Sequence, residues 1–332
     1  MQRIGVIGGG AWGTSLALLA RRAGRSVVLW ARESEVVEGV NRDHRNETYL
    51  PGVALDPELR AVADAREATR ADAVILAVPA QHLRSALAGV AADWPAGVPA
   101  VICAKGIERG TSALMSEVAE EALPKAPLAV LSGPSFAAEV ARDLPTAVVL
   151  AAIEPRLRTE LPAALSTPFF RIYSTDDVIG AELGGAVKNV LAIACGIVRG
   201  RRLGDNARAA LITRGLAETV RLGAAKGARA ETLMGLSGIG DLVLTCSAMR
   251  SRNFSLGAAL GRGIPLRQIM EARISVAEGV DSAEAVCSLA RRLDIDMPIC
   301  RAVDAVLNHG ADIDATIAAL LARPPKAEAL ST

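Results

Sequence analysis

The sequence predicts an α/β domain followed by an all-helical domain, and three observations support this fold class. Short apolar runs rich in Val, Ile and Ala alternate with helical segments up to about residue 173. Helical segments with little strand signal then extend from residue 178 to about residue 322. A length of 332 residues, 51% hydrophobic but only 3% aromatic, suits two domains with cores of Ala, Val and Leu. We therefore place the domains at residues 1–176 and 177–324, with a flexible tail at 325–332.

The apolar runs of the first domain are predicted strands, and we expect most of them to form a doubly wound parallel sheet. They cover residues 4–7, 27–30, 73–78, 100–104, 129–131, 146–151 and 169–173. In such sheets ligands bind beside the carboxyl ends of the strands. The loops that follow three successive strands, at residues 79–81, 105–106 and 132–135, are therefore expected at one edge that forms a site.

A glycine-rich turn separates the first strand from the first helix, which is predicted over residues 14–22. Gly8, Gly10 and Gly13 form the pattern G-x-G-x-x-G. In this position the pattern is typical of a Rossmann dinucleotide site, in which the glycines allow a tight turn, close approach of backbone to the pyrophosphate, and close helix packing. The helix N-terminus then binds the phosphates. The alternative is a glycine-rich turn in another kind of α/β protein.

The end of the second strand bears on the choice between NAD and NADP. Arg32 follows the strand and suits a ribose 2′-phosphate, whereas Glu33 suits the 2′-hydroxyl of NAD. We expect Arg32, rather than Glu33, to point inward. The sequence thus predicts NADP(H) as the preferred cofactor with NAD(H) as the alternative, unless both side chains are solvated loop charges.

A lysine lies within the most apolar segment of the second domain. Residues 183–198 are apolar nearly all round and are predicted to form a buried helix that contains Lys188. Burial disfavours the charged form, so we expect the pKa of Lys188 to be lowered toward the range of proton exchange. The structural alternative is a lysine that reaches solvent from a helix end or pairs with a carboxylate.

Three polar segments follow in the second domain. Residues 235–241 are expected to form a flexible turn that ends in the carboxylate of Asp241. Ser251, Arg252 and Asn253 together suit a phosphate or a carboxylate, although this run is equally typical of a solvated helix start. Residues 275–283 are predicted to be a polar break between helices.

Composition limits the possible partners and compartment. A net charge of +1 gives no reason to expect nucleic acid as a partner. The five cysteines lack C-x-x-C spacing and are expected to be reduced, buried thiols in a cytoplasmic protein, and the three histidines show no metal-ligand pattern. The glycines near the N-terminus argue against a signal peptide, and residues 183–198 are too short for a membrane span. We therefore expect neither a metal nor membrane insertion.

With these motifs in order, the chain resembles a bacterial-type NAD(P)-dependent glycerol-3-phosphate dehydrogenase over nearly its whole length. The resemblance rests on eight segments: GGGAWGTSLA (8–17), YLPG (49–52), AKGIE (104–108), SGPSFAAE (132–139), AVKN (186–189), GIGDLVLTC (238–246), SRN (251–253) and VAEGVDSA (276–283). It implies a Rossmann domain followed by a helical domain. It also implies reversible hydride transfer between NAD(P)H and dihydroxyacetone phosphate, giving sn-glycerol 3-phosphate for glycerophospholipid synthesis, and a homodimer.

The resemblance also implies roles for individual residues. Lys188 becomes the proton donor and acceptor. The implied substrate residues are Lys188 with Lys105, Gly133, Ser135, Asp241, Thr245, Ser251, Arg252 and Asn253. The implied cofactor residues, beside Gly8, Gly10 and Gly13 of the loop, are Ala11, Trp12, Arg32, Tyr49, Lys105, Ala137, Arg252, Val276 and Glu278.

Two other functions compete with this hypothesis. A related two-domain dehydrogenase of hydroxyacids or sugar acids shares the first domain and often a lysine in the second, but the SRN and GIGD segments argue against it. A non-catalytic sensor of NAD(P) redox state would tolerate loss of Lys188 and Asp241, and both are present.

Overall fold

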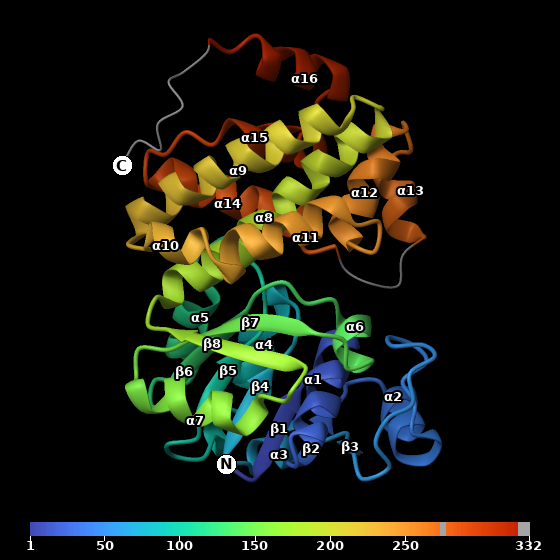
Figure 1. The fold of residues 1–332 in the computed structure, drawn as a ribbon, viewed down its shortest axis with the longest axis vertical. Helices are drawn as coiled ribbons and strands as arrows, with labels where there is room; N and C mark the ends of the chain where they lie inside the picture. The colour runs from blue at the N-terminus through green and yellow to red at the C-terminus, as the bar shows by residue number, and fades with distance from the viewer. Residues whose placement is uncertain (273–276, 325–332) are drawn as a thin grey trace. The chain divides into compact units, whose positions relative to one another are not determined.

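The computed structural model describes residues 1–272 and 277–324, and the chain divides into two compact units (Figure 1). Unit 1 comprises Met1–Ala104 and Met115–Val178, and unit 2 comprises Lys105–Leu114 and Ile179–Thr332. The segment Lys105–Leu114, which we assigned to the first domain from sequence, therefore groups with the helical unit. Its side chains Ile107 and Leu114 belong to the hydrophobic core of that unit, which explains the assignment. The predicted tail lies outside the described residues.

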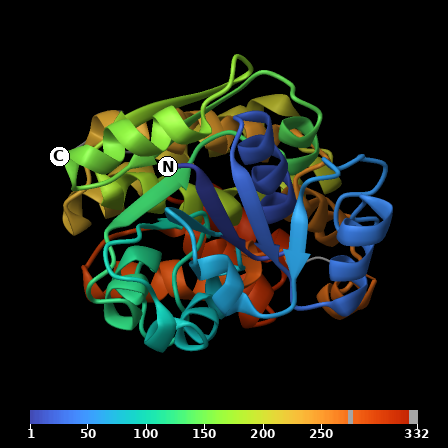
Figure 2. The ribbon, with the colours of Figure 1, turned by 90° about the horizontal axis from the view of Figure 1, so that it is seen from below.

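Unit 1 is built on an eight-stranded sheet with the strand order β3-β2-β1-β4-β5-β6-β7-β8. Adjacent strands from β3 to β6 are parallel, β7 is antiparallel to β6, and β8 is parallel to β7. Figure 2 shows β1, β2 and β3 side by side in dark to light blue. The strands are β1 (Arg3–Ile7), β2 (Ser26–Trp30), β3 (Arg60–Val62), β4 (Ala73–Leu76), β5 (Ala100–Ile102), β6 (Leu128–Ser132), β7 (Thr146–Ala151) and β8 (Phe170–Thr175).

The predicted strands and fold class are confirmed, with ends shifted by two residues at most. The strand β3 was not predicted, because its three residues include a charged one and are too few to show an alternating pattern. Since β4, β5 and β6 are parallel, their carboxyl ends lie at the same edge of the sheet, as expected.

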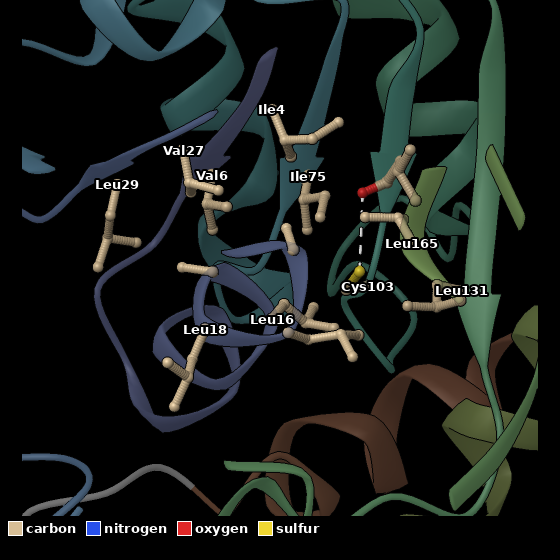
Figure 3. Packing of buried hydrophobic residues seen from close by; sticks show 14 of the residues in the cluster. Ile4, Val6, Leu16, Leu18, Val27, Leu29, Ile75, Cys103, Leu131 and Leu165 are labelled. Carbon is tan, nitrogen blue, oxygen red and sulfur yellow. Dashed lines mark hydrogen bonds between the residues drawn. The ribbon is translucent and has the colours of Figure 1, made fainter. Parts of the chain in front are cut away.

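Helices cover both faces of the sheet. Figure 3 shows Ile4, Val6 and Ile75 on the strands above α1, which carries Leu16 and Leu18, and all five belong to one core that α6 and α7 also join. On the other face, α3 approaches β1 closely. The helical segments of unit 1 are α1 (Ala11–Arg22), α2 (Ser34–Glu38), η1 (Gly39–Asp43), α3 (Ala65–Thr69), η2 (Ala80–His82), α4 (Leu83–Ala88), η3 (Ala91–Asp93), α5 (Met115–Ala122), α6 (Ala137–Ala141) and α7 (Pro155–Leu165).

Unit 2 is helical in its described residues after Val178, as predicted, with α8 (Val178–Gly200) at its centre (Figure 1). By length and composition α8 could cross a membrane, but its residues from Gly180 to Val198 are all buried inside the protein, which is typical of a core helix. The others are α9 (Asp205–Lys226), α10 (Ala230–Leu233), η4 (Leu236–Gly240), α11 (Asp241–Ser247), α12 (Arg252–Gly261), α13 (Leu266–Glu271), α14 (Gly279–Arg292), α15 (Pro298–Asn308) and α16 (Ile313–Leu321).

Helical structure extends into two polar segments of unit 2 that the sequence predicted to be a turn and a break. The predicted flexible turn at 235–241 is wrong, because residues Leu236–Gly240 form a π-helical turn that continues directly into α11. Close packing holds this turn: a Cβ atom on Gly184 of α8 would lie 2.3 Å from the Ser237 carbonyl oxygen. The predicted polar break at 275–283 falls partly outside the described residues, and it ends at Glu278 because α14 begins at the next residue.

The packing of this turn generates a prediction about Gly238. A Cβ atom at this position would lie 1.8 Å from the Leu233 carbonyl oxygen, which is backbone and cannot move aside alone. We expect Gly238→Ala to lower the free energy of unfolding of unit 2 by about 3 kcal/mol or more. Denaturant titration of this variant and of the control Gly235→Ala measures the difference in stability. In the control the nearest atom would lie 3.3 Å from the added Cβ. Equal stability of the two variants would contradict the packing described here.

Candidate active site

The carboxylate of Asp241 joins two lysines inside unit 2. Asp241 is the first residue of α11 and is 1% exposed. Its Oδ1 lies 2.5 Å from Nζ of Lys188, which projects from α8, and its Oδ2 lies 2.7 Å from Nζ of Lys105. The Thr245 hydroxyl, one helical turn after Asp241, accepts a further hydrogen bond from Lys188 at 3.0 Å. The structure therefore brings together four residues that the resemblance assigned to the substrate site.

Burial and neighbouring charges shift the pKa values of this cluster. Burial, helped by the nearby charge of Lys105, lowers the pKa of Lys188 to about 8 against the opposing effect of Asp241. Burial alone would raise the pKa of Asp241, but the two ammonium groups outweigh it and the net shift is downward. The predicted downward shift of the Lys188 pKa is confirmed, and the pairing with a carboxylate that was given as the structural alternative is present as well. The result is a fixed carboxylate beside an amine that can exchange a proton near neutral pH.

Asn189 connects this cluster to the helices around it, and sequence reasoning did not select it. Its amide nitrogen donates to the Lys105 carbonyl oxygen at 3.1 Å, and its Oδ1 accepts from the Asn253 side chain at 2.9 Å. Asn253 Oδ1 in turn accepts from the backbone N–H of Gly279 at 3.0 Å. A side-chain amide inside an apolar helix must find hydrogen-bond partners. The position of Asn189 in the apolar segment was therefore the feature of the sequence that could have identified it.

Ser251, Arg252 and Asn253 form the start of α12, so the run is a helix start, but it is not the solvated one that the alternative described. The Ser251 hydroxyl caps the helix by accepting from the Phe254 backbone N–H. Ser251 and Asn253 are buried, whereas Arg252 is exposed. A helix N-terminus with a serine, an arginine and an asparagine also provides donors and positive potential for an anion, so the two interpretations are compatible.

The phosphate loop of unit 1 has the geometry that the glycine pattern predicts. Gly8 has a φ of +124°, and a Cβ atom on Gly13 would lie 1.9 Å from the Gly8 carbonyl oxygen. Gly10 caps α1, and a Cβ atom added to it would meet nothing within 4 Å, so space remains for a ligand beside it. The helix begins at Ala11, three residues before the predicted start, because the chain turns into helix directly after Gly10.

The residues around the first turn of α1 fit a dinucleotide. The first backbone N–H groups of α1 have no partner within the helix, which is the usual way to hold phosphates. The indole Nε1–H of Trp12 is buried and has no hydrogen-bond partner among the described residues. The Ser15 hydroxyl is shared between the Ala11 carbonyl oxygen and the carbonyl oxygen of Ala137 at the start of α6. That contact brings Ala137 beside the loop.

The sheet edge of unit 1 carries Gly133 and Ser135 directly after β6. Gly133 has a φ of +137°, and a Cβ atom there would lie 3.0 Å from Val148 Cα of β7. The Ser135 hydroxyl donates to the Gly133 carbonyl oxygen at 3.0 Å. These two residues therefore belong to unit 1, while the other implied substrate residues belong to unit 2.

At the end of β2 the orientation of the two charged residues differs from the prediction. The side chain of Arg32 is 76% exposed, whereas that of Glu33 is 23% exposed. Glu33 is therefore the more inward residue, and Arg32 pairs with it from the solvent side. Of the remaining implied cofactor residues, Glu278 precedes α14 and contributes to the charge around Lys188, and Val276 lies outside the described residues.

The network around Asn189 generates a prediction about stability. We expect Asn189→Ala to lower the free energy of unfolding by about 2–3 kcal/mol, because it removes the buried hydrogen bonds that Asn189 makes with the Lys105 carbonyl and the Asn253 amide. Chemical denaturation, compared with Asn206→Ala on the exposed first turn of α9, measures this loss. A loss no larger than that of the control would show that these hydrogen bonds are replaced.

Comparison with known proteins identifies the family. The profile of the NAD-dependent glycerol-3-phosphate dehydrogenase N-terminus matches residues 3–157, and that of the C-terminus matches residues 177–318. Glycerol-3-phosphate dehydrogenase [NAD(P)+] of Rhodospirillum rubrum is 59% identical over 99% of this chain and 94% of its own length. The enzyme of the same name from Caulobacter vibrioides is 56% identical over 99% of both chains.

A solved structure gives the same result. The crystal structure of glycerol-3-phosphate dehydrogenase from Coxiella burnetii matches with a TM-score of 0.93 and 40% identity, covering 97% of this chain and 99% of the other. The match spans both the sheet-containing and the helical parts described above. The chain thus belongs to the NAD-dependent glycerol-3-phosphate dehydrogenase family.

Proposed function

We propose that this protein catalyses reversible hydride transfer between NAD(P)H and dihydroxyacetone phosphate, giving sn-glycerol 3-phosphate for glycerophospholipid synthesis. The observation that carries the proposal is the buried Lys188–Asp241–Lys105 cluster in a member of this family. The direct test is loss of NADPH or NADH absorbance when purified protein meets dihydroxyacetone phosphate. No loss with either cofactor would refute the proposal.

Lys188 is suited to the proton transfer that this reaction requires. When bound, NAD(P)H supplies the hydride, and the ketone oxygen then develops the charge of an alkoxide. The Lys188 ammonium stabilises that charge and donates the proton that completes the alcohol. In the reverse direction the neutral amine accepts this proton. Asp241 holds the lysine in place, and Lys105 adds a second positive charge to the cluster.

The start of α12 is suited to the phosphate of the substrate. Arg252 supplies an exposed guanidinium, the Ser251 hydroxyl keeps its own hydrogen for donation, and Asn253 has a second amide hydrogen beside the one bound to Asn189. Binding at this remote group would orient the ketone, which lowers the entropy cost of the hydride transfer.

The resemblance also leads us to propose a homodimer in the cytoplasm. All five cysteines are buried and free of disulfides, which agrees with a reducing compartment. Light scattering of the purified protein at micromolar concentration would give twice the chain mass for a dimer and the single chain mass otherwise.

The proposed role of Lys188 predicts the behaviour of its alanine variant. We expect Lys188→Ala to lower kcat for dihydroxyacetone phosphate reduction by about 1,000-fold, because both proton transfer and charge stabilisation are lost. NADPH binding, measured by fluorescence titration, should be retained because the phosphate loop belongs to unit 1. Lys125→Ala, at an exposed lysine, serves as the control. Turnover within a few-fold of wild type would remove Lys188 from the mechanism.

The same residue predicts opposite pH profiles for the two directions. With a Lys188 pKa of about 8, kcat/KM for ketone reduction should fall as the pH rises above that value, because the proton donor is lost. The kcat/KM for alcohol oxidation should rise through the same pH and then level off. Initial rates in both directions measure the profiles, and parallel profiles would contradict the assignment.

The proposed phosphate site predicts a binding defect for Arg252→Ala. Loss of a charge-assisted contact costs about 2–3 kcal/mol of binding free energy, so kcat/KM should fall roughly 30- to 150-fold. Most of this fall should come from a higher KM for dihydroxyacetone phosphate. Arg250→Ala, two residues earlier and likewise exposed, is the matched control. If the wild type used dihydroxyacetone without its phosphate equally well, or if Arg252→Ala left the KM unchanged, the assignment of the phosphate site would be wrong.

A further inference from the structure

Three segments of unit 1 meet around the end of β2. The phosphate loop lies against it, because a Cβ atom on Gly9 would be 2.4 Å from Cβ of Ala31. Arg32 and Glu33 follow Ala31 directly. The third segment is the turn that carries Tyr49, whose side chain lies close enough to Glu33 for that carboxylate to raise the pKa of the phenol.

Asn46 fixes this turn to the phosphate loop. Its buried amide nitrogen donates to the Gly9 carbonyl oxygen and to the Thr14 hydroxyl, each at 2.8 Å. Its Oδ1 accepts from the backbone N–H of Tyr49 at 3.2 Å. The backbone of the turn at Tyr49, beside Glu33, is therefore fixed relative to the loop.

Arg32 is held by the same carboxylate. Its Nε and Nη2 lie 3.1 and 2.7 Å from one oxygen, Oε1 of Glu33. Burial raises the pKa of Glu33, but the hydrogen bond and positive charge of Arg32, together with a backbone hydrogen bond, outweigh it and leave the pKa below its usual value. Glu33 is therefore a carboxylate at neutral pH, and the pair carries no net charge.

We propose that Glu33 determines cofactor preference by holding Arg32 in an internal ion pair and so disfavouring a ribose 2′-phosphate. A 2′-hydroxyl can donate to the carboxylate, which is the interaction typical of NAD sites at this strand end. A 2′-phosphate brings nearly two negative charges against the carboxylate, and it can be met by Arg32 only if the ion pair opens. In this protein Glu33 thus reduces the preference for binding NADPH over NADH that Arg32 alone would give.

The test measures nucleotide binding, so it does not depend on turnover. Adenosine 2′,5′-bisphosphate and adenosine 5′-monophosphate differ only in the 2′-phosphate, and calorimetry gives the Kd of each. We expect Glu33→Gln to tighten the bisphosphate about tenfold relative to wild type and to change the monophosphate by less than about threefold. Adding Arg32→Ala to Glu33→Gln should reduce the gain, because the released guanidinium is then absent.

The control is Glu38→Gln, which removes an equally charged, exposed side chain at the end of α2. The proposal would be overturned if the ratio of the bisphosphate Kd to the monophosphate Kd in Glu33→Gln stayed within twofold of the wild-type ratio. An equal shift in the Glu38 variant, or a gain that the removal of Arg32 leaves undiminished, would also overturn it. The inference rests on the proposed function, but the two can fail separately: absence of dihydroxyacetone phosphate reduction would leave the binding ratio measurable.

Discussion

The carboxylate of Asp241 is almost completely buried, and it accepts hydrogen bonds from two ammonium groups at once. Removing a carboxylate from water costs several kcal/mol unless it is paired, and here each oxygen has a lysine. The same burial disfavours the charged form of Lys188, so Asp241 and the apolar helix act on this lysine in opposite directions. The balance leaves an amine whose proton can leave near neutral pH while its position stays fixed.

Several parts of the helical unit serve to bring that carboxylate to the lysines. Lys188 is 53 residues and Lys105 is 136 residues away from Asp241 in sequence. The π-helical turn before Asp241 packs against Gly184, one turn before Lys188 on α8. The hydrogen bond from Asn189 to the Lys105 carbonyl holds the third member. The cluster therefore depends on backbone packing and buried amides as much as on its charged groups.

Charge pairing of a different kind governs the end of β2 in unit 1. Arg32 and Glu33 are neighbours in sequence, so their pairing requires no long-range packing, and Arg32 remains mostly exposed. Such exposed pairs contribute little to stability, and their importance lies in which charge a ligand would meet. The buried Asn46 sets the geometry by linking the phosphate loop to the turn of Tyr49.

Local patterns in the sequence determined the fold class, the predicted strands, the phosphate loop and the buried helix with Lys188, because each follows from residue spacing within about 20 positions. They also identified Lys105, Asp241 and Thr245 through the family motifs. Only the tertiary structure decided that 236–240 is helical, that Glu33 lies inward of Arg32, and that Asn46 and Asn189 connect distant segments. The physical reason is that a turn's packing, a side chain's exposure and a buried amide's partners all depend on residues far away in the chain.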